Sequence, residues 1–376
     1  MGSIPTLPRP ATPPPTPDHS SSDYHVYAVF CFREPTPSRT MSNWIQYYKP
    51  SDNTWNFVSS IPGLIENHVL KSFSMVSIGD SIYIIGGLLF NQQRADQSSE
   101  ESNLPVQVLS SVLRYNVHSQ QWFKCASLSI PRYDFACTVC ENKIYVAGGH
   151  STWASATGVS SAEVYDPNHD EWAPLPSMST MRYKCVGVTW KGKIHVVGGF
   201  AVREYASNEN PLTFTPERSS VEVYNTQGGN WDLMRRMWQL DVPPNQIVDV
   251  NGKLFSSGDC LKVWKGHIEA YDGEQNIWNE VDGSRLQTLI SPVCNSNSSC
   301  ENRALDQQLL YLTIAPIGTQ LYFLAGYQID DESSRTKSIV HVFDTSATRH
   351  AWRSFEPVEE EGQKVLCSHC CVVRVS

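Results

Sequence analysis

The chain has 376 residues, is 40% hydrophobic and carries a formal net charge of -9 at pH 7. No basic run exceeds two residues, so the sequence does not favour electrostatic binding of nucleic acid. It contains no stretch of 18 apolar residues, and no transmembrane helix is predicted.

The first 22 residues differ in composition from the rest of the chain. They contain seven prolines and no apolar core, so residues 1–22 are predicted to be a disordered Pro-rich tail and not a signal peptide. The opening "MGSIPT" fits the pattern for myristoylation at Gly2, but a chance match in a segment of small residues is the favoured interpretation.

A short apolar segment that ends in two glycines recurs along the chain. "SIYIIGG" ends at Gly87, "KIYVAGG" at Gly149 and "KIHVVGG" at Gly199, and weaker copies end at Gly258 and Gly326. After "KIYVAGG" there is neither the Lys-Ser/Thr pair of a P-loop nor the third glycine of a dinucleotide fold. The glycines are therefore interpreted as punctuation of a repeated structural unit.

A second signature follows each copy, in the form of two aromatic residues separated by turn-forming residues. An odd spacing across a hairpin places both rings on the same face of adjacent strands. The pairs are Tyr115 and Trp122, Tyr165 and Trp172, Tyr224 and Trp231, and Tyr271 and Trp278, each seven apart, and Phe343 and Trp352, nine apart.

Each unit is predicted to contain four strands. In one copy these are "RYDFACTV", "KIYVAGG", "AEVYD" and a strand that starts at Trp172. Four-stranded units repeating at roughly 50 residues match the period of a kelch propeller blade. The combined glycine and Tyr…Trp pattern resembles the kelch-repeat family over almost the whole chain, and in particular stand-alone plant kelch proteins.

The two ends of the chain each supply part of one further unit. Near the N-terminus, "HVYAVFCF" aligns with the glycine segment, and Tyr48 and Trp55 repeat the spacing of seven. The C-terminal "LCSHCCVVRV" fits a first strand without the rest of its unit. The expected fold is thus all-β: a single six-bladed kelch β-propeller over residues 23–376, closed by N- and C-terminal strands in a shared blade.

The chain has 11 cysteines and no predicted secretion signal, which favours reduced thiols and a cytoplasmic or nuclear location. Cys137-x-x-Cys140 and Cys367-x-x-Cys370-Cys371 have zinc-like spacing. Residues three apart on a strand face opposite sides, however, so these cysteines are interpreted as small buried hydrophobes. Cys294 and Cys300 bracket a loop, which is not by itself a site. No metal and no cofactor are predicted.

Four long insertions are predicted to emerge on one face of the propeller. Residues 88–109, 150–160 and 200–218 join second to third strands, and residues 282–304 join two blades. Strand parity brings them to the same end, where the first strands begin. Loops on a rigid scaffold often carry function.

Two Arg-Tyr pairs lie at the start of first strands on this face. Arg132 and Arg182 each precede the first glycine of their unit by 16 residues. The kelch resemblance implies that an Arg at this register projects toward the channel mouth and contacts acidic or polar ligands; the alternative is that these arginines bridge neighbouring blades. The predicted ligand-binding residues are Arg132, Tyr133, Asp134, Arg182 and Tyr183.

No catalytic residue can be assigned from the sequence. The Glu-x-x-x-Asp-x-x-x-His motif of iron-dependent plant specifier proteins is absent, nothing maps onto the copper-radical oxidases, and no GxSxG or HExxH motif is present. Proton transfer without a cofactor stays open, because Tyr133, Asp134, Tyr183 and His369 are expected on innermost strands. His369 is more simply interpreted as a packed channel residue.

The favoured function is a soluble, monomeric protein-interaction module that binds a protein or peptide through its loop-rich face. The alternative is a cofactor-free enzyme of isomerase, cyclase or lyase type, or a binder of a small plant metabolite at the propeller mouth. The 22 residues before the propeller are too short for an F-box or BTB domain. A wide polar mouth favours a protein partner, whereas a deep apolar pocket favours a small ligand.

Overall fold

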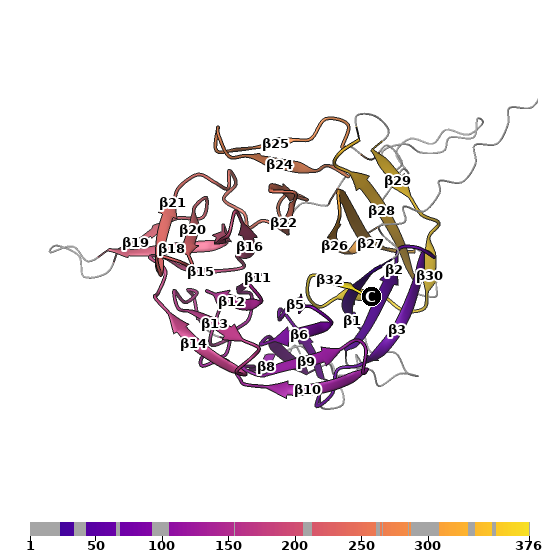
Figure 1. Ribbon diagram of the computed structural model, residues 1–376, viewed down its shortest axis with the longest axis horizontal. Helices are drawn as coiled ribbons and strands as arrows, with labels where there is room; N and C mark the ends of the chain where they lie inside the picture. The colour runs from indigo at the N-terminus through magenta and orange to yellow at the C-terminus, as the bar shows by residue number, and fades with distance from the viewer. Residues whose placement is uncertain are drawn as a thin grey trace, which may run out of the picture.

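The computed structural model describes residues 23–33, 43–64, 68–91, 105–153, 155–205, 213–260, 264, 266–284, 286, 308–329, 335–347 and 351–375. The regular structure within these ranges is β-strand, with no helix among them, which confirms an all-β chain. The predicted tail 1–22, Gly2 and the loop cysteines Cys294 and Cys300 lie outside the described residues. The sheets are arranged around a common centre (Figure 1).

Four sheets contain the four strands expected of each unit. Their strands are β5 (Ser74–Ile78), β6 (Ser81–Ile85), β9 (Val112–Asn116) and β10 (Gln121–Cys125); β11 (Ala136–Cys140), β12 (Lys143–Ala147), β13 (Ala162–Asp166) and β14 (Glu171–Leu175); β16 (Val186–Trp190), β17 (Lys193–Val197), β20 (Val221–Asn225) and β21 (Asn230–Met234); and β22 (Ile247–Val250), β23 (Lys253–Ser256), β24 (Glu269–Asp272) and β25 (Ile277–Glu280). Within each sheet, neighbouring strands are antiparallel.

Two sheets have five strands. One contains β26 (Leu309–Ile317), β27 (Gln320–Gln328), β28 (Thr336–Asp344), β29 (Trp352–Ser354) and β30 (Val358–Glu360). The other contains β1 (Tyr24–Phe32), β2 (Trp44–Lys49) and β3 (Thr54–Ser60) from the N-terminal part, with β31 (Lys364–Leu366) and β32 (Cys371–Arg374) from the C-terminal part. Both C-terminal strands pair with β1. The strands predicted to share a unit therefore lie in one sheet.

The aromatic pairs lie directly opposite each other, as their spacing predicts. Tyr165 pairs with Trp172 and Phe343 with Trp352, and the rings of each pair are 5.1 Å apart between centroids. The indole N–H also reaches the preceding sheet: Trp172 donates to the Ala126 carbonyl at 2.9 Å. Each such Trp thus packs within its own sheet and bonds to the preceding one.

The paired glycines mark places where neighbouring chain segments approach closely. Gly149 has φ of +88°, and a Cβ there would lie 2.6 Å from the Cβ of Phe135 and 2.7 Å from the Tyr133 carbonyl oxygen. Only glycine meets both requirements without displacing its neighbours. The glycines therefore set the geometry between strands instead of cradling a phosphate.

The innermost strands line the centre of the arrangement (Figure 1). Strand β11 contacts β5 and β16, β22 contacts β16 and β26, and β32 contacts β26 and β5. Apolar side chains between adjacent sheets form the core, as in the cluster that joins Tyr83 and Ile85 to Ile144 and Tyr165.

Two predicted loops contain strands, which corrects the sequence interpretation. In 88–109 the structure has β7 (Leu88–Asn91) and β8 (Pro105–Val108), which form a sheet with β4 (His68–Lys71). In 200–218 it has β18 (Phe200–Tyr205) and β19 (Thr213–Pro216), in a sheet with β15 (Met181–Tyr183). These hairpins pair with residues just ahead of the first strands, a long-range contact that local composition does not reveal. Most of the insertion 282–304 lies outside the described residues.

Candidate binding surface at the loop-rich end

Arg132 joins two consecutive sheets from a fully buried position. Its guanidinium donates to the carbonyl of Gly148 at 2.8 Å, to the carbonyl of Ser161 at 3.0 Å and to the Glu163 carboxylate at 2.9 Å. Its own carbonyl accepts a 2.7 Å hydrogen bond from the N–H of Gly87 in the preceding sheet.

Arg182 repeats this arrangement in the next unit. Its guanidinium donates to the carbonyl of Gly198 at 2.8 Å and to the hydroxyls of Ser220 and Thr180, while its carbonyl accepts from the Gly149 N–H at 2.8 Å. This side chain is also fully buried. The geometry thus supports the structural alternative for both arginines in place of the ligand-anchor interpretation, because the donors already have protein partners and solvent does not reach them.

The tyrosines after these arginines contribute to a row of four aromatic rings. Tyr133 lies 5.0 Å from His150, His150 lies 3.9 Å from Tyr183, and Tyr183 lies 5.1 Å from Phe200, all measured between ring centroids. The Arg218 guanidinium lies 5.3 Å from the Phe200 ring centroid. The structure therefore brings the two predicted tyrosines together through His150, at the start of the 150–160 insertion.

His150 was not singled out from the sequence. Both of its ring nitrogens are buried without a hydrogen-bond partner, an uncommon state for a polar side chain. Burial lowers the pKa of the His150 imidazole, while the charge of Asp134 acts in the opposite direction. The only local signal was its position directly after Gly149, whose φ is +88°.

Asp134 belongs to a chain of backbone contacts that crosses three sheets. Ser72, Asp134 and Lys184 all have φ between +51° and +55°. The Asp134 N–H donates to the Ser72 carbonyl at 3.1 Å, and the Lys184 N–H donates to the Asp134 carbonyl at 2.7 Å. Burial raises the pKa of the Asp134 carboxyl, against the effects of Ser72, Lys184 and His150. Such left-handed non-glycine residues persist only where the surrounding structure holds them.

Two large apolar side chains are exposed on two of the predicted insertions. Trp153, in 150–160, is 53% exposed, and Phe214, on β19, is 47% exposed. Exposed aromatic residues of this size are the kind of side chain that anchors protein interfaces. Phe57 on β3 and Phe123 on β10 are the other large hydrophobics of this type among the described residues.

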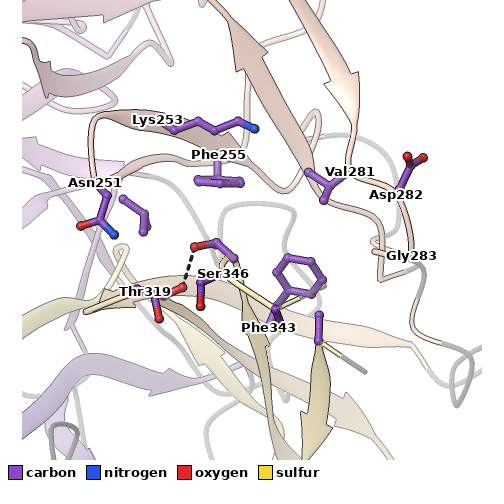
Figure 2. A pocket seen from close by; sticks show the side chains of 13 residues that line it. Asn251, Lys253, Phe255, Val281, Asp282, Gly283, Thr319, Phe343 and Ser346 are labelled. Carbon is purple, nitrogen blue, oxygen red and sulfur yellow. Dashed lines mark hydrogen bonds between the residues drawn. The ribbon is translucent and has the colours of Figure 1, made fainter. Parts of the chain in front are cut away.

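A cavity lies elsewhere, between the sheet of β22–β25 and the sheet of β26–β29. It has a volume of about 410 Å³ and is lined on one side by Asn251, Lys253 and Phe255 and on the other by Thr319 and Phe343 (Figure 2). Its walls mix polar and apolar groups and hold no convergent set of charged side chains.

The described residues contain no group of three or more His, Cys, Asp or Glu side chains that could hold a metal ion. Cys137 and Cys140, which have zinc-like spacing, are the second and the last residue of strand β11. No helix in the described part of the chain is long and apolar enough to cross a membrane.

Comparison with known proteins identifies the repeat. The family model described as "Attractin/LZTR1 beta-propeller" matches residues 11–207, just over half of the chain. The chain belongs to the kelch-type β-propellers. The sheets built on the glycine and Tyr…Trp signatures are thus the repeats of a kelch-type propeller, as the resemblance predicts.

The curated relatives of this kelch propeller include plant and animal proteins. Two F-box/kelch-repeat proteins of Arabidopsis thaliana are each 33% identical, over 34% and 46% of this chain and over 32% and 41% of their own lengths. Kelch-like protein 35 of Mus musculus is 26% identical over 33% of this chain and 17% of its own length. The chain spans less than half the length of these relatives.

Proposed function

We propose that this chain is a protein-interaction module that binds a protein or peptide through its loop-rich end. Kelch propellers generally serve as interaction modules, which supports the class of function. Within it, residues 23–376 form one six-bladed propeller whose last blade is shared by the two ends of the chain. The pairing of β1 with β32 supports this closure.

The observation that carries the proposal is the exposure of Trp153 and Phe214 on neighbouring insertions. The 150–160 insertion begins at His150 and the 200–218 insertion begins at Phe200, and both of these rings belong to the aromatic row. The two exposed aromatics therefore extend from a packed base. Because the base of both insertions is packed, less conformational entropy is lost when a partner orders Trp153 and Phe214.

Tyr183, Asp134 and Lys184 complete the proposed surface. Tyr183 and Asp134 are partly exposed and Lys184 is exposed, so the surface offers an apolar ring beside one acidic and one basic group. Arg132 and Arg182 support this surface from below and do not contact the partner. A mixed polar surface of this kind fits a polypeptide better than a small apolar metabolite.

The test compares partner capture by three forms of the full chain. Immobilised wild-type protein, the double variant Trp153→Ala with Phe214→Ala, and the control Phe57→Ala are incubated with plant extract, and bound proteins are quantified by mass spectrometry. A partner that uses this surface is depleted at least tenfold on the double variant and retained on Phe57→Ala, which removes an equally exposed ring from β3. Equal recovery on all three forms contradicts the proposal.

Wild-type protein and a Tyr183→Ala variant test the alternative of a small plant metabolite or a cofactor-free reaction. Native mass spectrometry of wild-type protein after incubation with a plant metabolite extract shows whether a small molecule is retained. Retention of a compound that is lost on Tyr183→Ala, with no protein partner captured, would replace the interaction module by the metabolite alternative.

A further inference from the structure

The shared sheet of the two chain ends contains two cysteines that meet across strands. Cys31 lies on β1, opposite Val365 of β31. One step further along, the N–H of Cys367 donates to the carbonyl of Val29 at 2.9 Å, which places Cys367 diagonally across from Cys31. Residues 29 and 31 share a face of β1, so both thiols point to the same side of the sheet.

Both thiols lie in one apolar cluster with Val29, Ile45 and Val69. The two thiols lie close enough for each to shift the pKa of the other, and Asn43 Nδ2 donates to the Cys367 sulfur at 3.1 Å. The contact with Cys367 and the charge of Lys71 lower the pKa of the Cys31 thiol, while burial acts in the opposite direction. Burial and the neighbouring Cys31 raise the pKa of the Cys367 thiol. Cys31 is thus the member of the pair that loses its proton more readily.

We propose that Cys31 and Cys367 are a dithiol site that peroxide oxidises to a disulfide, which links the N-terminal strand to the C-terminal segment. The bond would connect β1 to the residues between β31 and β32. It would fix covalently the place where the two ends of the chain otherwise meet through strand pairing and side-chain hydrogen bonds. This inference does not depend on the proposed binding function.

The chemistry balances with hydrogen peroxide as the oxidant. The Cys31 thiolate attacks one peroxide oxygen, the O–O bond breaks, and a sulfenic acid forms while the departing hydroxide takes a proton and leaves as water. The Cys367 sulfur then attacks the sulfenic sulfur, the S–O bond breaks, and the second oxygen leaves as water with the Cys367 proton. The two thiols lose two electrons in total, and the peroxide is reduced to two waters.

Access requires a local opening, because both thiols are buried. The C-terminal segment is suited to this, since β31 has only three residues and β32 only four. Short terminal strands open at lower free energy than the body of a sheet. Because the two thiols share a face of the sheet and one apolar cluster, reclosure returns the two sulfurs to neighbouring positions.

The test uses the intact chain treated with hydrogen peroxide or with dithiothreitol, then blocked with N-ethylmaleimide and digested with trypsin. We expect a linked peptide pair that joins Cys31 to Cys367 in the oxidised sample and is absent after reduction. Cys370→Ser and Cys371→Ser are matched controls, because they alter neighbouring thiols of the same tryptic peptide and leave the link intact. Cys31→Ser and Cys367→Ser abolish the link.

A second measurement covers the case in which a serine variant fails to fold. Thermal melts of oxidised and reduced wild-type protein are compared, and the oxidised form should melt about 3–5 °C higher, because the bond closes a loop of most of the chain. Oxidation that joins Cys31 to Cys370 or Cys371, oxidation that leaves Cys31 free, or a lower melting temperature of the linked form would each overturn the proposal.

Discussion

Arg132 and Glu163 form an ion pair that is closed to solvent, with 2.9 Å between the guanidinium nitrogen and the carboxylate oxygen and side-chain exposures of 0% and 3%. The charge of Arg132 is thus compensated inside the protein. Removing one member of a buried pair leaves the other charge without compensation, which is far more costly than the loss of an exposed pair.

We therefore expect Arg132→Met to lower the free energy of unfolding by about 3–5 kcal/mol. Urea denaturation followed by tryptophan fluorescence measures this change. Arg218→Ala is the control, because Arg218 is exposed and only covers the Phe200 ring; its effect should stay below about 1 kcal/mol. An Arg132→Met protein as stable as wild type, with weakened binding to its partner, would restore the ligand-anchor interpretation.

Gly149→Ala should destabilise the protein by more than about 3 kcal/mol, since the new methyl group meets both Phe135 and the Tyr133 carbonyl. Gly192→Ala is the matched control: its φ is +72°, but a Cβ there meets nothing within 4 Å. It should cost only about 1 kcal/mol, from backbone strain alone. Equal losses in the two variants, measured by thermal melts, would show that the close approach of Phe135 and Tyr133 adds nothing.

Stability should fall as the pH is lowered from about 6.5 toward 4, because of buried histidines. Burial lowers the pKa of His195, His341 and His369 to about 4, whereas an unfolded histidine titrates near 6.5. Between these values the unfolded state binds protons that the folded state does not, so the stability present above pH 6.5 is lost on acidification. Each histidine contributes at most about 3 kcal/mol.

His341→Gln should flatten this pH dependence. The measurement is urea denaturation at pH 7.5 and pH 5.0, with His169→Gln as the control because His169 is 74% exposed. Wild type and His169→Gln should lose stability in parallel, and His341→Gln should lose less. A His341→Gln protein with the full wild-type loss would show that this histidine is not kept neutral by burial.

Deletion of residues 366–376 should abolish the cooperative thermal transition. The deletion removes β32, whose four residues all pair with β1, and so opens the shared sheet. Removing Ser376 alone, which lies beyond β32, is the control and should leave the transition unchanged. An unchanged melt in the longer deletion would contradict closure by the two ends of the chain.

The sequence alone determined the strands of the repeated units and their local pairing. Tyr165 and Trp172 face each other because the parity of a hairpin follows from the number of residues in its turn, which is a local quantity. The glycine segments and the period of the repeat identified the family because they, too, can be read locally along the sequence. The joining of "HVYAVFCF" with the C-terminal strand also followed, since each lacked the strands that the other supplied.

The tertiary structure decided the roles of the site residues. Arg132 and Tyr133 are adjacent in sequence, but Arg132 turns inward to Gly148 and Glu163 while Tyr133 joins the aromatic row. Which groups receive the guanidinium depends on how the segment before β11 lies against the end of β12 and against β13, and no local pattern encodes that placement. His150 and the contact between Cys31 and Cys367 were missed for the same physical reason: their partners come from other sheets or from the opposite end of the chain.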